Sequence, residues 1–292
     1  MRMTIINIGH SRKVRLLALS GHDNKEYQQM LVRYFHERFL YRLSRSRYRD
    51  HFILKGGCLL FACDEFVPRP TLDIDFMGMR INRDTGTIES AFIQVMNTEV
   101  PDDGITFLPE TISSDPITIE KEYPGVRVTF DGRLDSIRKT LTMDIGFGDI
   151  IIPHPVDMNY PTILDEEDRI DILAYSLETV VAEKFQTMIE RSILNSRMKD
   201  FFDLHRILSV HVFDEDILQS AINATFENRN TEYTPSHLIF TDEFMNDSVM
   251  SQRWNNFLKK MKIESEMTFP EIVRFITTRL KPYWDRLSSK AE

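Results

Sequence analysis

Two aspartates separated by one residue stand in a segment that otherwise predicts a buried strand. The segment TLDIDF places Asp73 and Asp75 on either side of Ile74. Side chains alternate between the two faces of a strand, so both carboxylates project to one face, and Leu72, Ile74 and Phe76 project to the other. Two residues of strand separate the carboxylates by about 6.6 Å, where an effective dielectric of about 20 gives roughly 2.5 kcal/mol of repulsion. The pattern therefore indicates a positive charge beside this strand.

A third acid, Asp144, has the same setting in the strand-like segment TLTMDIGFGD, whose apolar residues alternate on the opposite face. An isolated aspartate there would simply be solvated. If the two strands are neighbours, however, Asp144 converges with Asp73 and Asp75, and such clusters of carboxylate oxygens suit Mg²⁺ or Mn²⁺. A divalent ion would supply the positive charge, neutralise the phosphates of a nucleotide and align an attacking oxygen with phosphorus.

The residues before the first acidic pair are compatible with the same chemistry. Gly56 and Gly57 permit a tight turn whose backbone N–H groups could cradle a phosphate, although a plain strand-to-helix turn would need the same residues. Thr71 could donate a hydrogen bond to a γ-phosphate or cap the end of the strand. Cys58 follows the glycines, so the cradle would depend on backbone N–H groups.

The composition is that of an ordinary globular protein, with 292 residues of which 42% are hydrophobic and 28% charged. No run of eighteen apolar residues occurs, so no transmembrane helix is expected, and basic residues interrupt the N-terminal apolar stretch, unlike in a signal peptide. The two cysteines, Cys58 and Cys63, indicate reduced thiols in a cytoplasmic protein. The net charge of −9 argues against a protein coated in nucleic acid.

The elements that must position these acids form two groups along the chain. Helices are expected over residues 23–48 and 88–97, and strands around the two acidic segments and through residues 105–152. From residue 176 onward the periodicity predicts mostly helix, over residues 176–194, 198–210, 214–228, 252–262 and 271–287, with a capping box from Thr268 to Glu271. The sequence thus predicts an α/β lobe over residues 1–165 and a helical lobe over residues 166–292.

The end of the first helix is strongly basic. Six arginines occur between positions 33 and 49 against two acids up to position 50. A solvated helix end explains this about as well as a local phosphate-binding surface does. On the second interpretation, Arg38, Arg42 and Arg45 are candidate RNA contacts.

Four segments, in order along residues 30–210, resemble the AbiEii/AbiGii nucleotidyltransferase-type toxin family: FILKGGCLL, RPTLDIDF, TMDIGFGDIIIP and SLETVVAEKFQTMIERSILNSRMKDFFDL. The resemblance implies an α+β fold, with a nucleotidyltransferase core of mixed sheet and flanking helices, followed by a helical lobe. It also implies transfer of a nucleoside monophosphate from a nucleoside triphosphate with release of pyrophosphate. The family includes toxins of phage-defence pairs and transferases that act on tRNA 3′ ends, so a tRNA acceptor and a cognate antitoxin are expected.

The last of these segments adds candidates from the helical lobe. Lys184 and Arg191 are seven residues apart on one helix face and could reach one anion. Amid apolar neighbours, Lys184 either extends to water or meets a nucleotide phosphate, and the resemblance favours the phosphate. Asp200 and Asp203 share a face of the next helix, where Lys199 could pair with Asp203.

The resemblance places Lys184 and Asp200 in the active site with Asp73 and Asp75, and Asp144 would complete the cluster as a metal ligand or as a base. Asp200 would orient either Lys184 or the attacking hydroxyl, and the sequence leaves both open. Three rival functions also remain at this stage: transfer onto a protein hydroxyl, nucleotide binding without catalysis, and metal-dependent RNA cleavage. The P-loop motif G-x-x-x-x-G-K-[ST] is absent from the sequence, which excludes P-loop chemistry.

Overall fold

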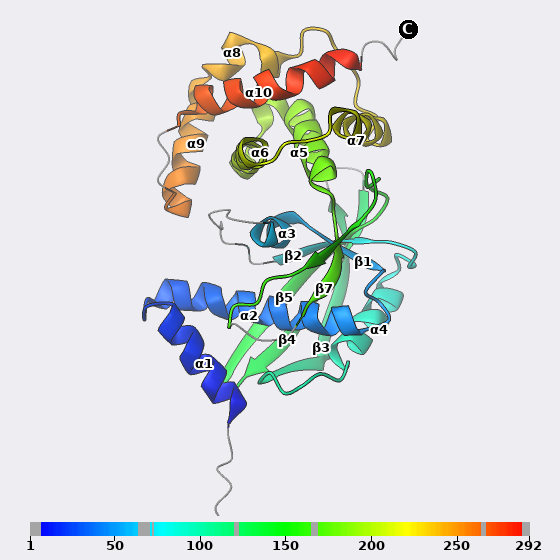
Figure 1. Ribbon diagram of the computed structural model, residues 1–292, viewed down its shortest axis with the longest axis vertical. Coiled ribbons are helices and arrows are strands. Elements are labelled where there is room, and N and C mark those ends of the chain that lie inside the picture. The colour runs from blue at the N-terminus through cyan, green and yellow to red at the C-terminus, as the bar shows by residue number, and fades with distance from the viewer. Residues whose placement is uncertain are drawn as a thin grey trace, which may run out of the picture. The chain divides into compact units, whose positions relative to one another are not determined.

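The computed structural model describes residues 7–63, 71, 73–119, 123–164, 169–263 and 267–287. Leu72, expected on the apolar face of its strand, lies outside these residues. The chain divides into two compact units (Figure 1). The first comprises Met1–Gly148 and Val156–Ala174, and the second comprises Asp149–Pro155 and Tyr175–Glu292.

A seven-stranded mixed sheet forms the centre of the first unit. Its strand order is β3-β4-β5-β2-β1-β7-β6, with parallel pairing of β2 with β5 and of β1 with β7. The strands are β1 (Phe52–Lys55), β2 (Asp73–Gly78), β3 (Ile105–Ile119), β4 (Tyr123–Leu134), β5 (Ile137–Gly146), β6 (Val156–Asn159) and β7 (Asp171–Ala174). The α+β fold class with a mixed sheet is therefore confirmed. The last two strands were not predicted, and β7 extends the sheet beyond residue 165.

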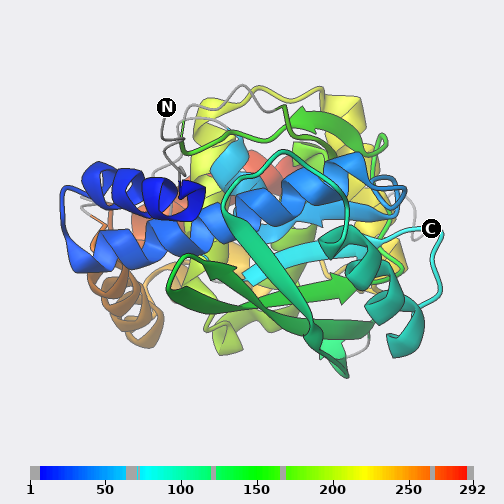
Figure 2. The same ribbon diagram turned by 90° about the horizontal axis from the view of Figure 1, so that it is seen from below.

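Helices flank this sheet, namely α1 (Ile8–Leu19), α2 (Asn24–Arg45), α3 (Gly56–Ala62) and α4 (Thr85–Met96). Asp23 caps α2 by accepting from the backbone N–H of Glu26 at 2.9 Å, and Asp84 caps α4 in the same way. The helix α1 was not predicted. In Figure 2, α1 and α2 (blue) run across the sheet unit.

Aromatic side chains define the buried face of the sheet. Phe39 of α2 and Phe92 of α4 meet with ring centroids 5.3 Å apart, and Phe52 of β1 lies 5.1 Å from Phe92. Phe76 of β2 contacts Phe52 at 5.9 Å, so it points to this same aromatic layer. Because side chains alternate along β2, Asp75 points to the other face.

The second unit is helical. Its helices are α5 (Leu177–Arg191), α6 (Met198–Val210), α7 (Glu215–Asn228), α8 (Asp242–Met245), α9 (Ser248–Met261) and α10 (Phe269–Arg286), with 3₁₀ turns at Ser192–Leu194 and Leu238–Phe240. Trp284 of α10 is fully buried against Phe185 and Phe226. The capping box predicted between Thr268 and Glu271 is confirmed. Within the described part of the chain, every helix is too short or too polar to cross a membrane.

Candidate active site

The register of the sheet brings the three strand acids together. The parallel pairing of β2 and β5 sets Asp75 directly beside Asp144 and Asp73 beside Thr142. Ile74 and Phe76 are buried, whereas all three acids are half-buried. One carboxylate oxygen of each acid lies within 4.8 Å of the other two. Hard oxygen donors at this spacing are a candidate binding site for a divalent cation.

The ligand set fits Mg²⁺ or Mn²⁺ in chemistry. Each Mg–O bond is about 2.1 Å, so two oxygens on opposite sides of the ion are about 4.2 Å apart and two adjacent oxygens about 3.0 Å apart. Oxygens within 4.8 Å of one another must therefore approach by up to about 1.8 Å to share one ion, which rotation of the carboxylate side chains would supply. Carboxylates without nitrogen or sulfur donors favour these hard cations over zinc.

Gly56 is the residue on which this geometry depends. It has φ = +69°, in the left-handed region that glycine adopts readily. A Cβ atom at this position would lie 1.9 Å from Oδ2 of Asp75 and 2.7 Å from its Cγ. The carboxylate of Asp75 therefore occupies the space that any other side chain at position 56 would need.

A cationic residue that the sequence analysis missed, Arg127, completes the cluster. On β4 it lies directly opposite Asp144 of β5. Its Nε donates to Oδ1 of Asp144 and its Nη2 to Oδ2, each at 2.7 Å. These hydrogen bonds raise the pKa of Arg127, with a smaller contribution from the charges of Asp73 and Asp75. The signal in the sequence is an arginine between Val126 and Val128 in the alternating segment GVRVTF.

Opposite charges thus form a row across four neighbouring strands. Lys55 of β1 pairs in register with Asp75 of β2, which pairs with Asp144 of β5, which pairs with Arg127 of β4. Residues directly opposite one another in a sheet share a face, so the two acids lie between two basic residues. The positive charge expected from the acidic pair therefore comes at least in part from the protein itself.

Thr71 and Cys58, two further residues of the first unit, lie beside Asp73. The Thr71 hydroxyl is 3.3 Å from the carbonyl oxygen of Asp73 and 3.4 Å from its Oδ1. Cys58 is buried, and its thiol donates to the same carbonyl at 3.5 Å. Gly57 is buried at the start of α3. Cys63, the other cysteine, is half-buried.

In the second unit, Lys184 lies in a compact charged group. Its Nζ donates to Asp200 at 2.9 Å and to Asp203 at 2.7 Å, and Arg197 also donates to Asp200 at 2.7 Å. Burial alone would raise the pKa of Asp200, but the charges of Lys184 and Arg197 outweigh it and lower this pKa to about 2. Asp200 and Asp203 together therefore fix the position of the Lys184 amine. Arg191, the last residue of α5, is half-buried.

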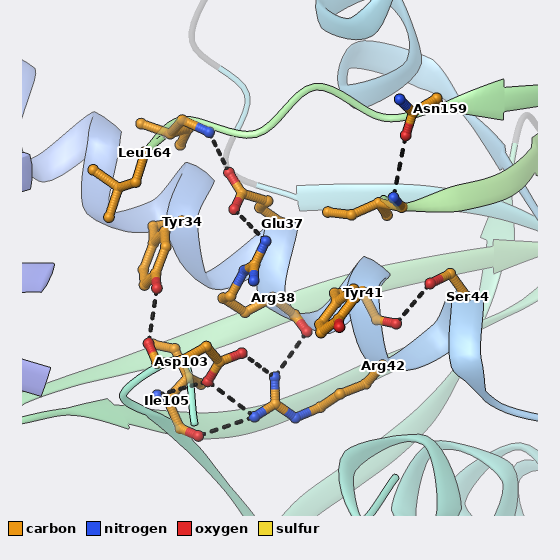
Figure 3. A network of polar contacts seen from close by, with 12 residues as sticks. Tyr34, Glu37, Arg38, Tyr41, Arg42, Ser44, Asp103, Ile105, Asn159 and Leu164 are labelled. Carbon is orange, nitrogen blue, oxygen red and sulfur yellow. Dashed lines mark hydrogen bonds and ion pairs between the residues drawn. The ribbon is translucent and has the colours of Figure 1, made fainter. Parts of the chain in front are cut away.

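Two of the three arginines expected to contact RNA are buried, and Figure 3 shows their polar contacts. The Arg38 guanidinium is fully buried and donates to Glu37 at 2.6 Å. Arg42 is buried too and donates to Asp103 at 2.7 Å and to the Ile105 carbonyl at 3.1 Å. Both arginines neutralise interior carboxylates and cannot meet a phosphate.

The third of these arginines, Arg45, is exposed beside Tyr41. Its role in RNA binding stays a prediction.

The sequence model of the family described as nucleotidyl transferase AbiEii toxin, type IV toxin–antitoxin system, matches residues 38–285. The chain belongs to this family. It is accordingly a nucleotidyltransferase, and membership implies a nucleotide substrate and an antitoxin partner.

Among curated proteins no match is found. Two crystal structures from Helicobacter pylori resemble this member of the AbiEii family. A candidate nucleotidyltransferase is 15% identical with a TM-score of 0.48, over 91% of this chain and 98% of that one. The protein JHP933 is 14% identical with a TM-score of 0.48, over 90% of this chain and 95% of that one.

Proposed function

We propose that this AbiEii-family protein is a Mg²⁺-dependent toxin that transfers a nucleoside monophosphate from a nucleoside triphosphate to an RNA hydroxyl, a tRNA 3′ end in the first instance. The observation that carries the proposal is the convergence of three carboxylates on one face of the sheet. Lys55 and Arg127 offset part of the repulsion between these like charges, and a bound divalent ion would offset more of it.

Asp73, Asp75 and Asp144 would hold the divalent ion, which when bound would neutralise phosphate charge and polarise the reacting phosphorus. Gly56 leaves room for the Asp75 carboxylate. In the reaction, the acceptor oxygen forms a bond to the α-phosphorus, the bond between the α-phosphorus and the bridging oxygen breaks, and pyrophosphate leaves. The acceptor proton passes to solvent or to a carboxylate.

The second unit supplies Lys184 and Arg191 as proposed ligands of the triphosphate, on the basis of the family resemblance. Both oxygens of Asp200 accept from cations, so Asp200 would orient Lys184 and not the attacking hydroxyl. A lysine amine fixed by two buried carboxylates keeps its position without a nucleotide, which limits the entropy lost on binding.

The decisive experiment incubates the protein with each α-labelled nucleoside triphosphate, Mg²⁺ and total cellular RNA or protein. We expect the label in RNA, its removal by ribonuclease, and its absence with Asp73→Ala. Label that survives ribonuclease and is removed by protease would show a protein acceptor. Wild-type transfer rates with Asp73→Ala would contradict the proposed metal site.

A further inference from the structure

Arg127 binds an acid that the proposed metal would also need. It contacts both oxygens of Asp144, and its side chain is 47% exposed whereas that of Asp144 is 14% exposed. A bidentate guanidinium–carboxylate pair fixes the plane and direction of the carboxylate. Asp144 is therefore aimed by its partner across the strands and does not depend on a cation for its orientation.

We infer that Arg127 competes with the metal: it occupies Asp144 while the metal is absent and thereby lowers the affinity of the site for free divalent cations. This inference depends on the proposed function, since it takes the three acids to be the metal ligands. Arg127 and the metal compete for the same carboxylate, so a bound cation must weaken or displace the ion pair.

The structure explains why this competition is reversible. About half of the Arg127 side chain is exposed, so water can solvate the guanidinium when it leaves one oxygen of Asp144. Arg127 can therefore release an oxygen of Asp144 readily. The charge of the guanidinium remains close to the metal and continues to oppose it.

The direction of the effect follows from these charges. Replacing Arg127 by a neutral residue removes both a competitor for Asp144 and a like charge beside the metal. With this competitor and this like charge removed, we expect roughly tenfold tighter binding, which corresponds to about 1.4 kcal/mol. A weaker site for the free ion favours loading of the metal together with the anionic nucleotide.

Arg138 provides a matched control on the same two strands. It bridges from β5 to Asp131 of β4, and the exposed fractions of these two side chains, 54% and 15%, are close to those of the Arg127 pair. The Arg138→Gln variant therefore loses an equal charge and a cross-strand ion pair of similar exposure, but at an acid outside the triad.

The experiment titrates Mn²⁺ into the wild-type protein, Arg127→Gln and Arg138→Gln by calorimetry, after thermal unfolding has shown all three to be folded. We expect roughly tenfold tighter binding with Arg127→Gln and unchanged binding with Arg138→Gln. Arg127→Lys keeps the charge but only one contact with Asp144, so its Mn²⁺ affinity should lie between those of wild type and Arg127→Gln.

Equal or weaker binding by Arg127→Gln would overturn this role. Asp73→Asn separates that result from a failure of the proposed function. If Asp73→Asn abolishes Mn²⁺ binding, the metal site stands whatever Arg127 does. If Asp73→Asn binds Mn²⁺ as tightly as wild type, the proposed site itself is wrong.

Discussion

The Gly56→Ala variant tests whether the position of the Asp75 carboxylate matters for activity. The added Cβ atom would lie 1.9 Å from Oδ2 of Asp75, where ordinary van der Waals contact begins at 3.4 Å. The carboxylate must therefore move away by about 1.5 Å, whereas catalytic sites tolerate a displacement of only about 0.5 Å. A misplacement of about 1 Å can lower a rate by about 100-fold. We expect kcat/KM to fall by at least about 100-fold and the Mn²⁺ affinity to fall with it.

Gly21→Ala is the matched control for the backbone. Gly21 also has a positive φ, +59°, but a Cβ atom there meets nothing within 4 Å. Each variant places an alanine in the left-handed region, at a cost of about 1–2 kcal/mol. Thermal unfolding should therefore show destabilisation in both, whereas nucleotide transfer and Mn²⁺ binding should fall with Gly56→Ala alone.

The reasoning would be refuted if Gly56→Ala transferred nucleotide and bound Mn²⁺ as well as Gly21→Ala does. That result would mean that Asp75 can move by more than 1 Å without effect on the reaction, or that it is not a metal ligand. Loss of activity in both variants would instead point to general destabilisation.

Further predictions concern stability and metal removal. Asp200→Asn should lower the free energy of unfolding at pH 7 by about 2 kcal/mol, because the pKa of Asp200 is depressed to about 2 in the folded state. The stability that Asp200 contributes is lost as the pH falls through its folded-state pKa. The difference in the free energy of unfolding between wild type and Asp200→Asn, measured by urea unfolding, should therefore narrow from pH 4 towards pH 2. Arg42→Ala should cost about 3–5 kcal/mol because it leaves Asp103 buried without its partner, whereas the exposed Arg45→Ala should stay within about 0.5 kcal/mol. EDTA should stop labelled nucleotide transfer, and added Mg²⁺ should restore it; transfer that persists in EDTA would contradict a metal-dependent reaction.

The sequence predicted elements whose signals are local. The capping box of Thr268 and Glu271 was found because capping depends on residues within one turn of the helix. The short strands β6 and β7 were missed because four residues carry little periodicity, and β6 also lies between Pro155 and Pro161. The place of β7 is set by pairing with the distant strand β1, where Ala174 aligns with Leu54, and β6 in turn pairs with β7.

The acids of the candidate site could be found from the alternation along each strand, but their partners could not. Arg127 is 17 residues from Asp144, and only the register between β4 and β5 makes them neighbours. In α2 the sequence analysis expected arginines that contact RNA. Their spacing gave no sign that Arg38 and Arg42 are buried. The partner of Arg38 is the adjacent residue Glu37, whereas the partner of Arg42 is Asp103, which lies 61 residues away in the sequence.

These neighbouring charges bear on how the metal site relates to folding. Carboxylate oxygens 4.8 Å apart repel by roughly 1 kcal/mol at the dielectric of water and by roughly 3.5 kcal/mol at a dielectric of about 20. Arg127 lowers this repulsion without any ion, because its guanidinium faces Asp144 directly. The sheet can therefore form before metal binds, and removing Asp73 relieves repulsion without opening the aromatic layer on the other face. Activity lost in Asp73→Ala at unchanged or slightly raised stability can accordingly be assigned to chemistry and not to misfolding.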